Sequence, residues 1–495
     1  MVLEKNLHWY FLPHPMNNPT VVIASVPWTD SDFPIMAPAM LKSVLTAQGI
    51  TAATVDLNAE VRHRIADHPN KDSILKFFLT EQVDRPAKSD VLDTIDFMAR
   101  RLLAFDPRWV ALSLLSYLSQ IPCRWLCMRI RQLSPDTKIV IGGPGAAVSL
   151  KSLDEYAPVL KRQGLIDHFV TGDSELSFPR LILGQTDYPG VDNANWQQLD
   201  DLNSQPFPDF DDYNWSLYPI KAISIVGSKG CVRECTFCDI HEHWSKYQWR
   251  SGDNIFAEMQ YQRERHGINF FTFADSLVNG NQKEYRRLIT LLAEYNALQT
   301  CPEDRIRWTG AFIIRPQDQM KEADWALTAA SGAEMLSVGV ESFVEHIRYH
   351  IKKKFSNTDL DFALNMGQRH NVKMILLMIV GYVTETQQDF EQQLQWVRDN
   401  KHYADNPVHM VQIGSGLGIL PGTWLDRNQQ MLGLTVPNTE VSQDWSCDSI
   451  GSTPILRMKW HHLMQKELIQ NGFTADYMQD NHVLIESYIN DKYNS

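Results

Sequence analysis

Positive charge, long apolar runs and cysteine are all scarce in this chain of 495 residues. Lysine and arginine total 46 against 59 aspartate and glutamate residues, so the formal net charge is −13 and no broad basic surface favours a nucleic acid or an anionic membrane as a partner. No run of 18 apolar residues predicts a membrane-spanning helix, and the N-terminus does not show the basic-then-apolar order of a secretion signal. Seven cysteines without a regular framework predict a reducing compartment, the cytoplasm.

Three of the cysteines occur together, in the segment Gly230-Cys-Val-Arg-Glu-Cys-Thr-Phe-Cys-Asp239. Cys231, Cys235 and Cys238 have the spacing C-x3-C-x2-C, and Phe237 directly precedes the third. Three thiolates on one loop can hold three irons of a [4Fe–4S] cluster and leave the fourth iron open to a small molecule. A structural zinc site is the alternative, although such sites are normally closed by four ligands. The spacing therefore favours a cluster with one open iron.

The first part of the chain alternates short apolar runs with helical stretches, and the length predicts two or three domains. We expect strands at 20–26, 51–56, 109–115, 138–143 and 166–172, and a helix over 35–49 despite Pro38. This alternation predicts a Rossmann-like, doubly wound parallel sheet over residues 1–185. Ligands of such sheets bind at the carboxyl ends of the strands. The residues at those ends are Ser113, Leu114, Ser116, Gly142, Gly143 and Gly172.

A second series of strands and helices begins at about residue 222. Six strands are expected, at 222–226, 269–275, 307–314, 335–341, 373–381 and 409–413. Six such units predict a partial (β/α)6 barrel over 220–423, with its functional groups at the carboxyl ends of the strands. Between the two series, residues 186–219 are rich in Asp, Asn and Pro and are expected to be a linker. Residues 424–495 are expected to form a small, mainly helical region that shapes the substrate site.

Several motifs in this order resemble those of radical S-adenosylmethionine (SAM) enzymes that carry a cobalamin-binding domain. In the second series the resemblance rests on the cysteine loop, Ala274-Asp-Ser276, Ser337-Val-Gly-Val-Glu-Ser342, Ile379-Val-Gly-Tyr-Val-Thr-Glu385 and Leu420-Pro-Gly-Thr423. In the first it rests on Ser113-Leu-Leu-Ser-Tyr117, Ile141-Gly-Gly-Pro-Gly145 and Thr171-Gly-Asp-Ser-Glu175. One departure is Val383, which stands where the family has proline.

The resemblance implies a [4Fe–4S] cluster on the three cysteines, whose open iron binds SAM and whose electron cleaves SAM to a 5′-deoxyadenosyl radical. It implies SAM contacts by Phe237, Ala274, Asp275, Ser276, Arg315, Glu341, Val380 and Gly381. Two of these have alternatives, because Asp275 could be a helix N-cap and Arg315 could belong to a structural ion pair. Lys352-Lys-Lys354 is expected to be a solvated face.

Cobalamin is implied in the first domain, on Ser113, Leu114, Ser116, Gly142, Gly143 and Gly172, where glycine would let the backbone approach the corrin. No histidine lies between His68 and His168, so the Asp-x-His-x-x-Gly motif of classical cobalamin methyltransferases is absent. Cobalamin would then bind without a histidine below cobalt. The alternative is a Rossmann-like domain that carries no cofactor.

The function that the resemblance implies is cobalamin-dependent methylation of an unactivated carbon of a small molecule or peptide. The implied electron donor is a protein such as flavodoxin or ferredoxin. One alternative keeps the radical chemistry but replaces methyl transfer with cyclisation, rearrangement or dehydrogenation. A second alternative is a non-enzymatic iron–sulfur or zinc protein.

Overall fold

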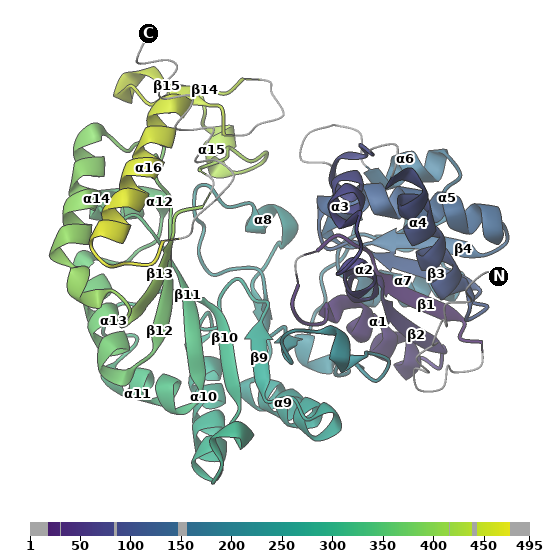
Figure 1. The fold of residues 1–495 in the computed structure, drawn as a ribbon. Helices are drawn as coiled ribbons and strands as arrows, with labels where there is room; N and C mark the ends of the chain where they lie inside the picture. The colour runs from purple at the N-terminus through teal and green to yellow at the C-terminus, as the bar shows by residue number, and fades with distance from the viewer. Residues whose placement is uncertain are drawn as a thin grey trace. The chain divides into compact units, whose positions relative to one another are not determined.

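The computed structural model describes residues 18–29, 31–83, 87–146, 156–414, 416–437 and 443–475. The chain divides into two compact units (Figure 1). Unit 1 comprises Met1–Ser224 with Glu264–Ile268, and unit 2 comprises Ile225–Arg263 with Asn269–Ser495. The expected boundaries at 185, 219 and 423 stay a prediction, and the ends of the regions 1–185 and 424–495 lie outside the described residues.

Unit 1 is built on a five-stranded parallel sheet with the strand order β2-β1-β3-β4-β5. Its strands are β1 (Val21–Ser25), β2 (Ala52–Asp56), β3 (Trp109–Ser113), β4 (Lys138–Gly142) and β5 (His168–Phe169). Ser25, Ser113 and Gly142 are paired across β1, β3 and β4, so they lie level at the carboxyl ends. In this strand order the chain reverses direction across the sheet between β1 and β3, where such sheets bind ligands.

Helices cover both faces of this sheet because its strands are apolar on both faces. Val22 and Ala24 of β1 belong to a core formed with α2–α6, whereas Val21 and Ile23 belong to a core formed with α1 and α7. The helices are α1 (Met36–Ala47), α2 (Leu57–Ile65), α3 (Lys71–Thr80), α4 (Lys88–Leu103), α5 (Gln120–Leu133), α6 (Tyr156–Arg162) and α7 (Ser174–Ile182). Pro38 lies in the first turn of α1, where a backbone N–H has no helical partner to lose.

The segment 186–219 is held on unit 1 by polar contacts. Buried Lys42 of α1 forms ion pairs with Asp209 at 3.2 Å and with Asp212 at 2.7 Å. Asp212 also accepts a hydrogen bond of 2.8 Å from the Thr54 backbone N–H of β2. This segment is therefore fastened to the elements of the first sheet.

Unit 2 is built on a six-stranded sheet in the order β13-β12-β11-β10-β9-β6, whose first strand, β6, begins at the boundary between the units. The six strands lie side by side in the order in which they occur in the chain. The strands are β6 (Ile223–Ile225), β9 (Phe270–Phe273), β10 (Arg307–Phe312), β11 (Ala333–Glu341), β12 (Lys373–Met378) and β13 (Val408–Gln412). Strands β9 through β13 are paired in parallel throughout. All six strands coincide with the predicted ones to within a few residues.

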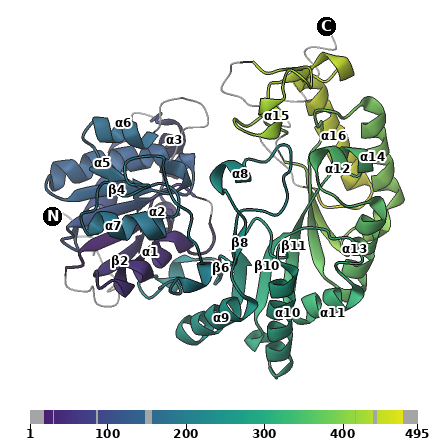
Figure 2. The same cartoon turned by 180° about the vertical axis from the view of Figure 1, so that it is seen from behind.

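Helices connect successive strands of this sheet, and several of them lie along one of its faces (Figures 1 and 2). They are α9 (Gly252–His266), α10 (Gln282–Ala297), α11 (Glu322–Ala330), α12 (Glu345–Ile351), α13 (Asn357–His370) and α14 (Gln387–Asp399). Apolar strands followed by amphipathic helices produce this β/α arrangement because each helix must bury its apolar face on the sheet. In the described part of the chain, every helix is too short or too polar to cross a lipid bilayer.

The C-terminal elements are α15 (Trp424–Arg427), β14 (Leu434–Thr435), β15 (Ser446–Cys447) and α16 (Pro454–Gln470), and α16 packs on α14. Trp460 of α16 stacks on Phe390 of α14 with ring centroids 4.8 Å apart, and Arg398 pairs with Glu467 at 2.8 Å. This region joins the barrel-like unit through both apolar and ionic contacts.

Candidate functional site

The cysteine loop is closed at its base by a two-stranded antiparallel pair. β7 (Ser228–Lys229) precedes the loop and pairs with β8 (Gln248–Trp249), which follows it. Gly230 begins the loop with φ +79°, and a Cβ there would lie 3.0 Å from the Lys246 carbonyl oxygen, so glycine is required. This pair could not be predicted, because strands of two residues have no readable hydrophobic period.

Cys231, Cys235 and Cys238 are free, partly buried and close enough to affect one another's ionisation. Burial raises the pKa of Cys235 to about 11, against the lowering effect of Lys353, and burial also raises the pKa of Cys238. The Arg233 backbone N–H donates to Cys231 Sγ at 3.4 Å. Backbone N–H groups that donate to sulfur help to set the reduction potential of an iron–sulfur cluster.

Among the described residues, no three His, Cys, Asp or Glu side chains are arranged to hold one metal ion. In a [4Fe–4S] cube each thiolate binds a different iron, whereas a structural zinc ion takes all of its ligands itself.

Thr236, inside the cysteine motif, fixes the second half of the loop. Its backbone N–H donates to the Ile351 carbonyl at 3.2 Å, and its carbonyl accepts from the Leu425 N–H at 3.0 Å. Its hydroxyl lies 2.6 Å from the hydroxyl of buried Tyr382, which is also 2.9 Å from His350 Nδ1. The loop is thus anchored to α12, α15 and the segment after β12.

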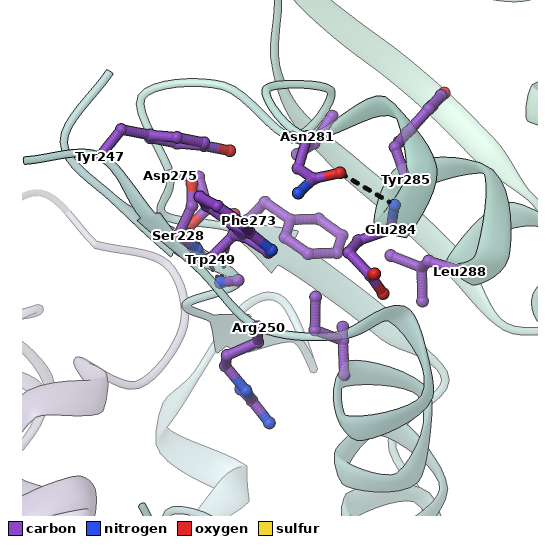
Figure 3. A pocket seen from close by; sticks show the side chains of 13 residues that line it. Ser228, Tyr247, Trp249, Arg250, Phe273, Asp275, Asn281, Glu284, Tyr285 and Leu288 are labelled. Carbon is purple, nitrogen blue, oxygen red and sulfur yellow. Dashed lines mark hydrogen bonds between the residues drawn. The ribbon is translucent and has the colours of Figure 1, made fainter. Parts of the chain in front are cut away.

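Asp275 lies directly after β9 and holds the backbone that leads into the cysteine loop. Its Oδ1 accepts from the N–H groups of Gly227 at 2.9 Å and Ser228 at 2.6 Å. Burial raises the pKa of Asp275 to about 7, although these two N–H groups and Arg250 act to lower it. A cavity of about 20 Å³, room for roughly one water molecule, lies beside the carboxylate (Figure 3).

The alternative that Asp275 caps a helix is wrong. The N-cap of α10 is Asn281, whose Oδ1 accepts from the N–H groups of Lys283 and Glu284. Asp275 lies too early in the chain for that position, because a turn separates β9 from α10. Its neighbours Ala274 and Ser276 are exposed at the end of the strand.

Glu341 ends β11 and forms a buried ion pair with Lys353, at 2.7 Å between Oε1 and Nζ. Burial acts to lower the pKa of Lys353, but Glu341 and the cysteine thiols outweigh it and the pKa is raised. The expectation of a solvated face at Lys352-Lys-Lys354 is therefore wrong for Lys353, which is 8% exposed. Three adjacent lysines carry no pattern that distinguishes the buried one.

Arg315 follows β10 and is half-buried beside Cys231 and Arg233. Its Nη2 donates to the carbonyls of Asn279 at 2.9 Å and Gly280 at 2.7 Å. Burial lowers the pKa of Arg315, and its Nε has no partner among the described residues. Arg315 therefore forms no structural ion pair with the described residues, because its guanidinium donates to backbone carbonyls instead.

The turn after β12 is held by a second buried carboxylate. Glu385 Oε2 accepts from the N–H groups of Gly381 at 2.7 Å and Tyr382 at 3.0 Å. Burial raises the pKa of Glu385 to about 7. Val380 is fully buried, and Gly381 has φ +80°. The substitution at Val383 leaves the turn intact, because the carboxylate fixes its backbone.

The C-terminal region reaches this same turn. A Cβ at Gly381 would lie 2.5 Å from Cδ of Arg457, which is on α16. The Arg457 guanidinium lies 3.6 Å from the ring centroid of buried Trp445 and donates to the carbonyls of Gln443 and Trp445, each at 2.7 Å. The described part of the region predicted to shape the substrate site is thus in contact with a predicted SAM-binding turn.

In unit 1 the predicted cofactor residues gather at the carboxyl ends of β3 and β4. A Cβ at Gly143 would lie 2.5 Å from the Leu114 carbonyl oxygen, and one at Gly142 would lie 2.7 Å from Val170 Cγ2. Gly172 has φ +69° and lies against the ring of Trp196. These glycines are required by close contacts within the chain, which is a different reason from the approach of a corrin.

The loop after β3 presents the groups that face outward. Leu115 and Tyr117 are 45% and 63% exposed, although both are large and apolar. Between them, the buried hydroxyl of Ser116 has no hydrogen-bond partner in the described part of the chain. Ser113, by contrast, is engaged, since its carbonyl accepts from the Val26 N–H at 3.1 Å.

Comparison with protein families identifies the unit that contains the cysteines. The model of the radical SAM superfamily matches residues 225–397. This part of the chain is a radical SAM domain. The predicted family is confirmed, and with it the pair of cofactors that such a domain uses, a [4Fe–4S] cluster and SAM.

Two characterised relatives match parts of the chain. The anaerobic magnesium-protoporphyrin IX monomethyl ester cyclase of Synechocystis sp. is 23% identical over 293 residues, 55% of this chain and 56% of that enzyme. The cytidylyl-2-hydroxyethylphosphonate methyltransferase of Streptomyces wedmorensis is 27% identical over 185 residues, 34% of this chain and 33% of that enzyme. The chain therefore spans about half of the first relative and about a third of the second.

Two solved structures have the fold of the whole chain. The radical SAM methyltransferase TsrM from Kitasatospora setae, with cobalamin and a [4Fe–4S] cluster bound, has a TM-score of 0.60 at 15% identity and covers 94% of this chain and 92% of that chain. The cobalamin-dependent SAM radical enzyme OxsB, with aqua-cobalamin bound, has a TM-score of 0.64 at 12% identity and covers 96% and 76%. This likeness confirms the predicted Rossmann-like sheet followed by a partial barrel.

Proposed function

We propose that the chain is a cobalamin-dependent radical SAM enzyme that methylates an unactivated carbon of a small molecule or peptide. The observation that carries this proposal is the position of Cys231, Cys235 and Cys238, on a loop that follows the first strand of a six-stranded parallel sheet. When bound, the cluster and SAM supply a 5′-deoxyadenosyl radical, and cobalamin supplies the methyl group. The chain's own residues bind and orient these groups.

In this proposal the cysteines hold the cluster and the ends of β9 to β12 hold SAM. Ala274 and Ser276 are exposed at the end of β9, where carbonyl and hydroxyl oxygens can accept from an ammonium group. Arg315 retains an unpartnered buried Nε among the described residues, which suits a carboxylate. Phe237, Glu341, Val380 and Gly381 complete the proposed SAM contacts.

Cobalamin is assigned to the carboxyl edge of the sheet in unit 1. The outward-facing Leu115 and Tyr117 offer an apolar surface to a macrocycle. The hydroxyl of Ser116, which has no partner among the described residues, can bond one of its amide groups. Ser113, Leu114, Gly142, Gly143 and Gly172 build the backbone of that edge. His168 in β5 contacts Asp192 through Nδ1 at 2.6 Å, and the proposal assigns it no part in binding cobalt.

The methyltransferase relative and TsrM support methyl transfer, but the cyclase relative favours a second candidate function. In that candidate, radical cyclisation or rearrangement occurs without transfer of a methyl group. Either reaction requires one electron from a low-potential donor, for which flavodoxin or ferredoxin is the proposed partner.

The two candidates are separated by experiment on the anaerobically reconstituted chain. We expect iron and sulfide with hydroxocobalamin to give corrin bands above an iron–sulfur shoulder after desalting. With dithionite and SAM labelled in its methyl group, we expect 5′-deoxyadenosine and label on cobalamin, both measured by mass spectrometry. Deoxyadenosine without label on cobalamin would favour the second candidate. Cys235→Ala should abolish both products, whereas Cys301→Ala, at an exposed cysteine outside the loop, should not.

A further inference from the structure

The ion pair between Glu341 and Lys353 is buried, and the backbone of Glu341 has an uncommon conformation. Both residues are 8% exposed, and their charged atoms are 2.7 Å apart. Glu341 adopts φ +67°, in the left-handed region that strains a residue other than glycine. A Cβ on Gly339 would lie 2.6 Å from Glu341 Oε1 and 2.6 Å from Lys353 Nζ, so a side chain at this position would displace the paired atoms.

This pair lies beside the cysteine loop. The backbone N–H of Thr236, next to Cys235, donates to the carbonyl of Ile351, two residues before Lys353. The electrostatic influence of Lys353 reaches Cys235 and Cys231, and that of Glu341 reaches Cys235. A buried ion pair is weak evidence for stability, because its desolvation offsets most of the attraction. Stability alone therefore does not account for this pair.

We propose that Lys353, held and partly neutralised by Glu341, is a positioning residue that sets the reduction potential of the cluster on the cysteine loop. This inference rests on the proposed function, because it requires the cluster. One electron from a low-potential donor adds one negative charge to the cluster and takes up no proton. A fixed positive charge nearby favours that added charge, and a fixed negative charge opposes it.

The structure predicts shifts of opposite sign for the two partners. Lys353→Met removes the cation and leaves Glu341 unopposed, so the potential should become more negative. Glu341→Gln leaves the cation unopposed, so the potential should become less negative. Each shift should be about tenfold in the reduction equilibrium, which for one electron is about 59 mV. A purely structural role would not move the two variants in opposite directions.

The experiment is a potentiometric titration of the reconstituted chain without SAM, followed by electron paramagnetic resonance, with iron and sulfide measured for each variant. The double variant Glu341→Gln/Lys353→Met should return to within about threefold of the wild-type equilibrium. Lys353→Arg should also keep the wild-type potential because it keeps the charge. Lys354→Met, at an exposed neighbour, is the control for loss of one positive charge.

The outcomes distinguish failure of the proposed function from failure of the inference about Lys353. If no variant, including the wild type, takes up a reducible cluster, the proposed function fails and this inference fails with it. If the clusters form but the potentials of Lys353→Met and Glu341→Gln coincide with the wild type, or shift in the same direction, the inference alone is overturned. If Lys353→Met does not retain the cluster, Glu341→Gln still tests the sign of the shift in potential. Lys353→Arg still tests whether the positive charge sets the potential.

Discussion

At the residue scale, two buried carboxylates hold the backbone where strands of the radical SAM domain end. Asp275 accepts from the N–H groups that follow β6, and Glu385 accepts from those that follow β12. Burial raises the pKa of each to about 7. Because a raised carboxyl pKa means that the folded state binds the proton more tightly, these groups favour the fold at low pH and lose that contribution as pH rises through 7.

We therefore expect Asp275→Asn to flatten the fall in stability between about pH 4 and pH 7. From 3.8 to about 7 the shift corresponds to at most about 4 kcal/mol at 1.36 kcal/mol per unit. The measurement is the thermal midpoint of the metal-free chain from pH 4 to 8, with Asp318→Asn at an exposed aspartate as the control. The double variant Asp275→Asn/Glu385→Gln should flatten the pH dependence of the thermal midpoint further. An unchanged slope for Asp275→Asn would show that Asp275 does not titrate in this range.

At the element scale, the cysteine loop is an insertion between two short strands that other elements must hold in place. Thr236 provides that hold through the hydroxyl contact with buried Tyr382. Loss of this hydroxyl contact should loosen the loop locally without disturbing the sheet, because Thr236 and Tyr382 both lie outside the strands. A buried hydrogen bond of this kind contributes about 1 kcal/mol net.

We predict that Thr236→Val speeds loss of the reconstituted cluster to a chelator by a factor of about 5 to 10, followed as bleaching of the iron–sulfur absorbance. Tyr382→Phe should have a similar effect, and the double variant should lose little more, since both changes remove one interaction. Thr290→Val, which removes a hydroxyl from α10 far along the chain from the loop, is the control. Equal chelation rates in all variants would contradict an anchoring role for Thr236.

Some elements of the radical SAM domain could be predicted from the sequence and others could not. Strands of unit 2 were predictable because buried runs such as 335–341 are apolar, and the cysteine spacing carries its own chemistry. The β7–β8 pair, the buried Lys353 and the hydroxyl of Thr236 were not, because each depends on contacts between distant segments. Asp275 shows the same limit, since an aspartate before a helix predicts a cap, and only the fold shows that Asn281 is the cap.

At the scale of the whole molecule, the two proposed cofactor sites belong to different units. Two described apolar clusters are built from the sheet and helices of unit 1, and the cluster against which Cys235 and Phe237 pack is built from unit 2. A change confined to the edge of one sheet should therefore leave the other core intact. Loss of one cofactor need not follow from loss of the other.

We predict that cofactor uptake can be removed from each unit independently. Leu115→Asp with Tyr117→Ala should reduce bound corrin at least tenfold, because it replaces the exposed apolar surface of the β3 loop, yet leave iron and sulfide content unchanged. Cys235→Ala should have the opposite pattern. Tyr349→Ala, at an exposed tyrosine of unit 2, controls for loss of surface aromatic area. Iron, sulfide and corrin measured on the same desalted samples would decide the matter, and full corrin binding by the Leu115–Tyr117 variant would place cobalamin elsewhere than the carboxyl edge of β3.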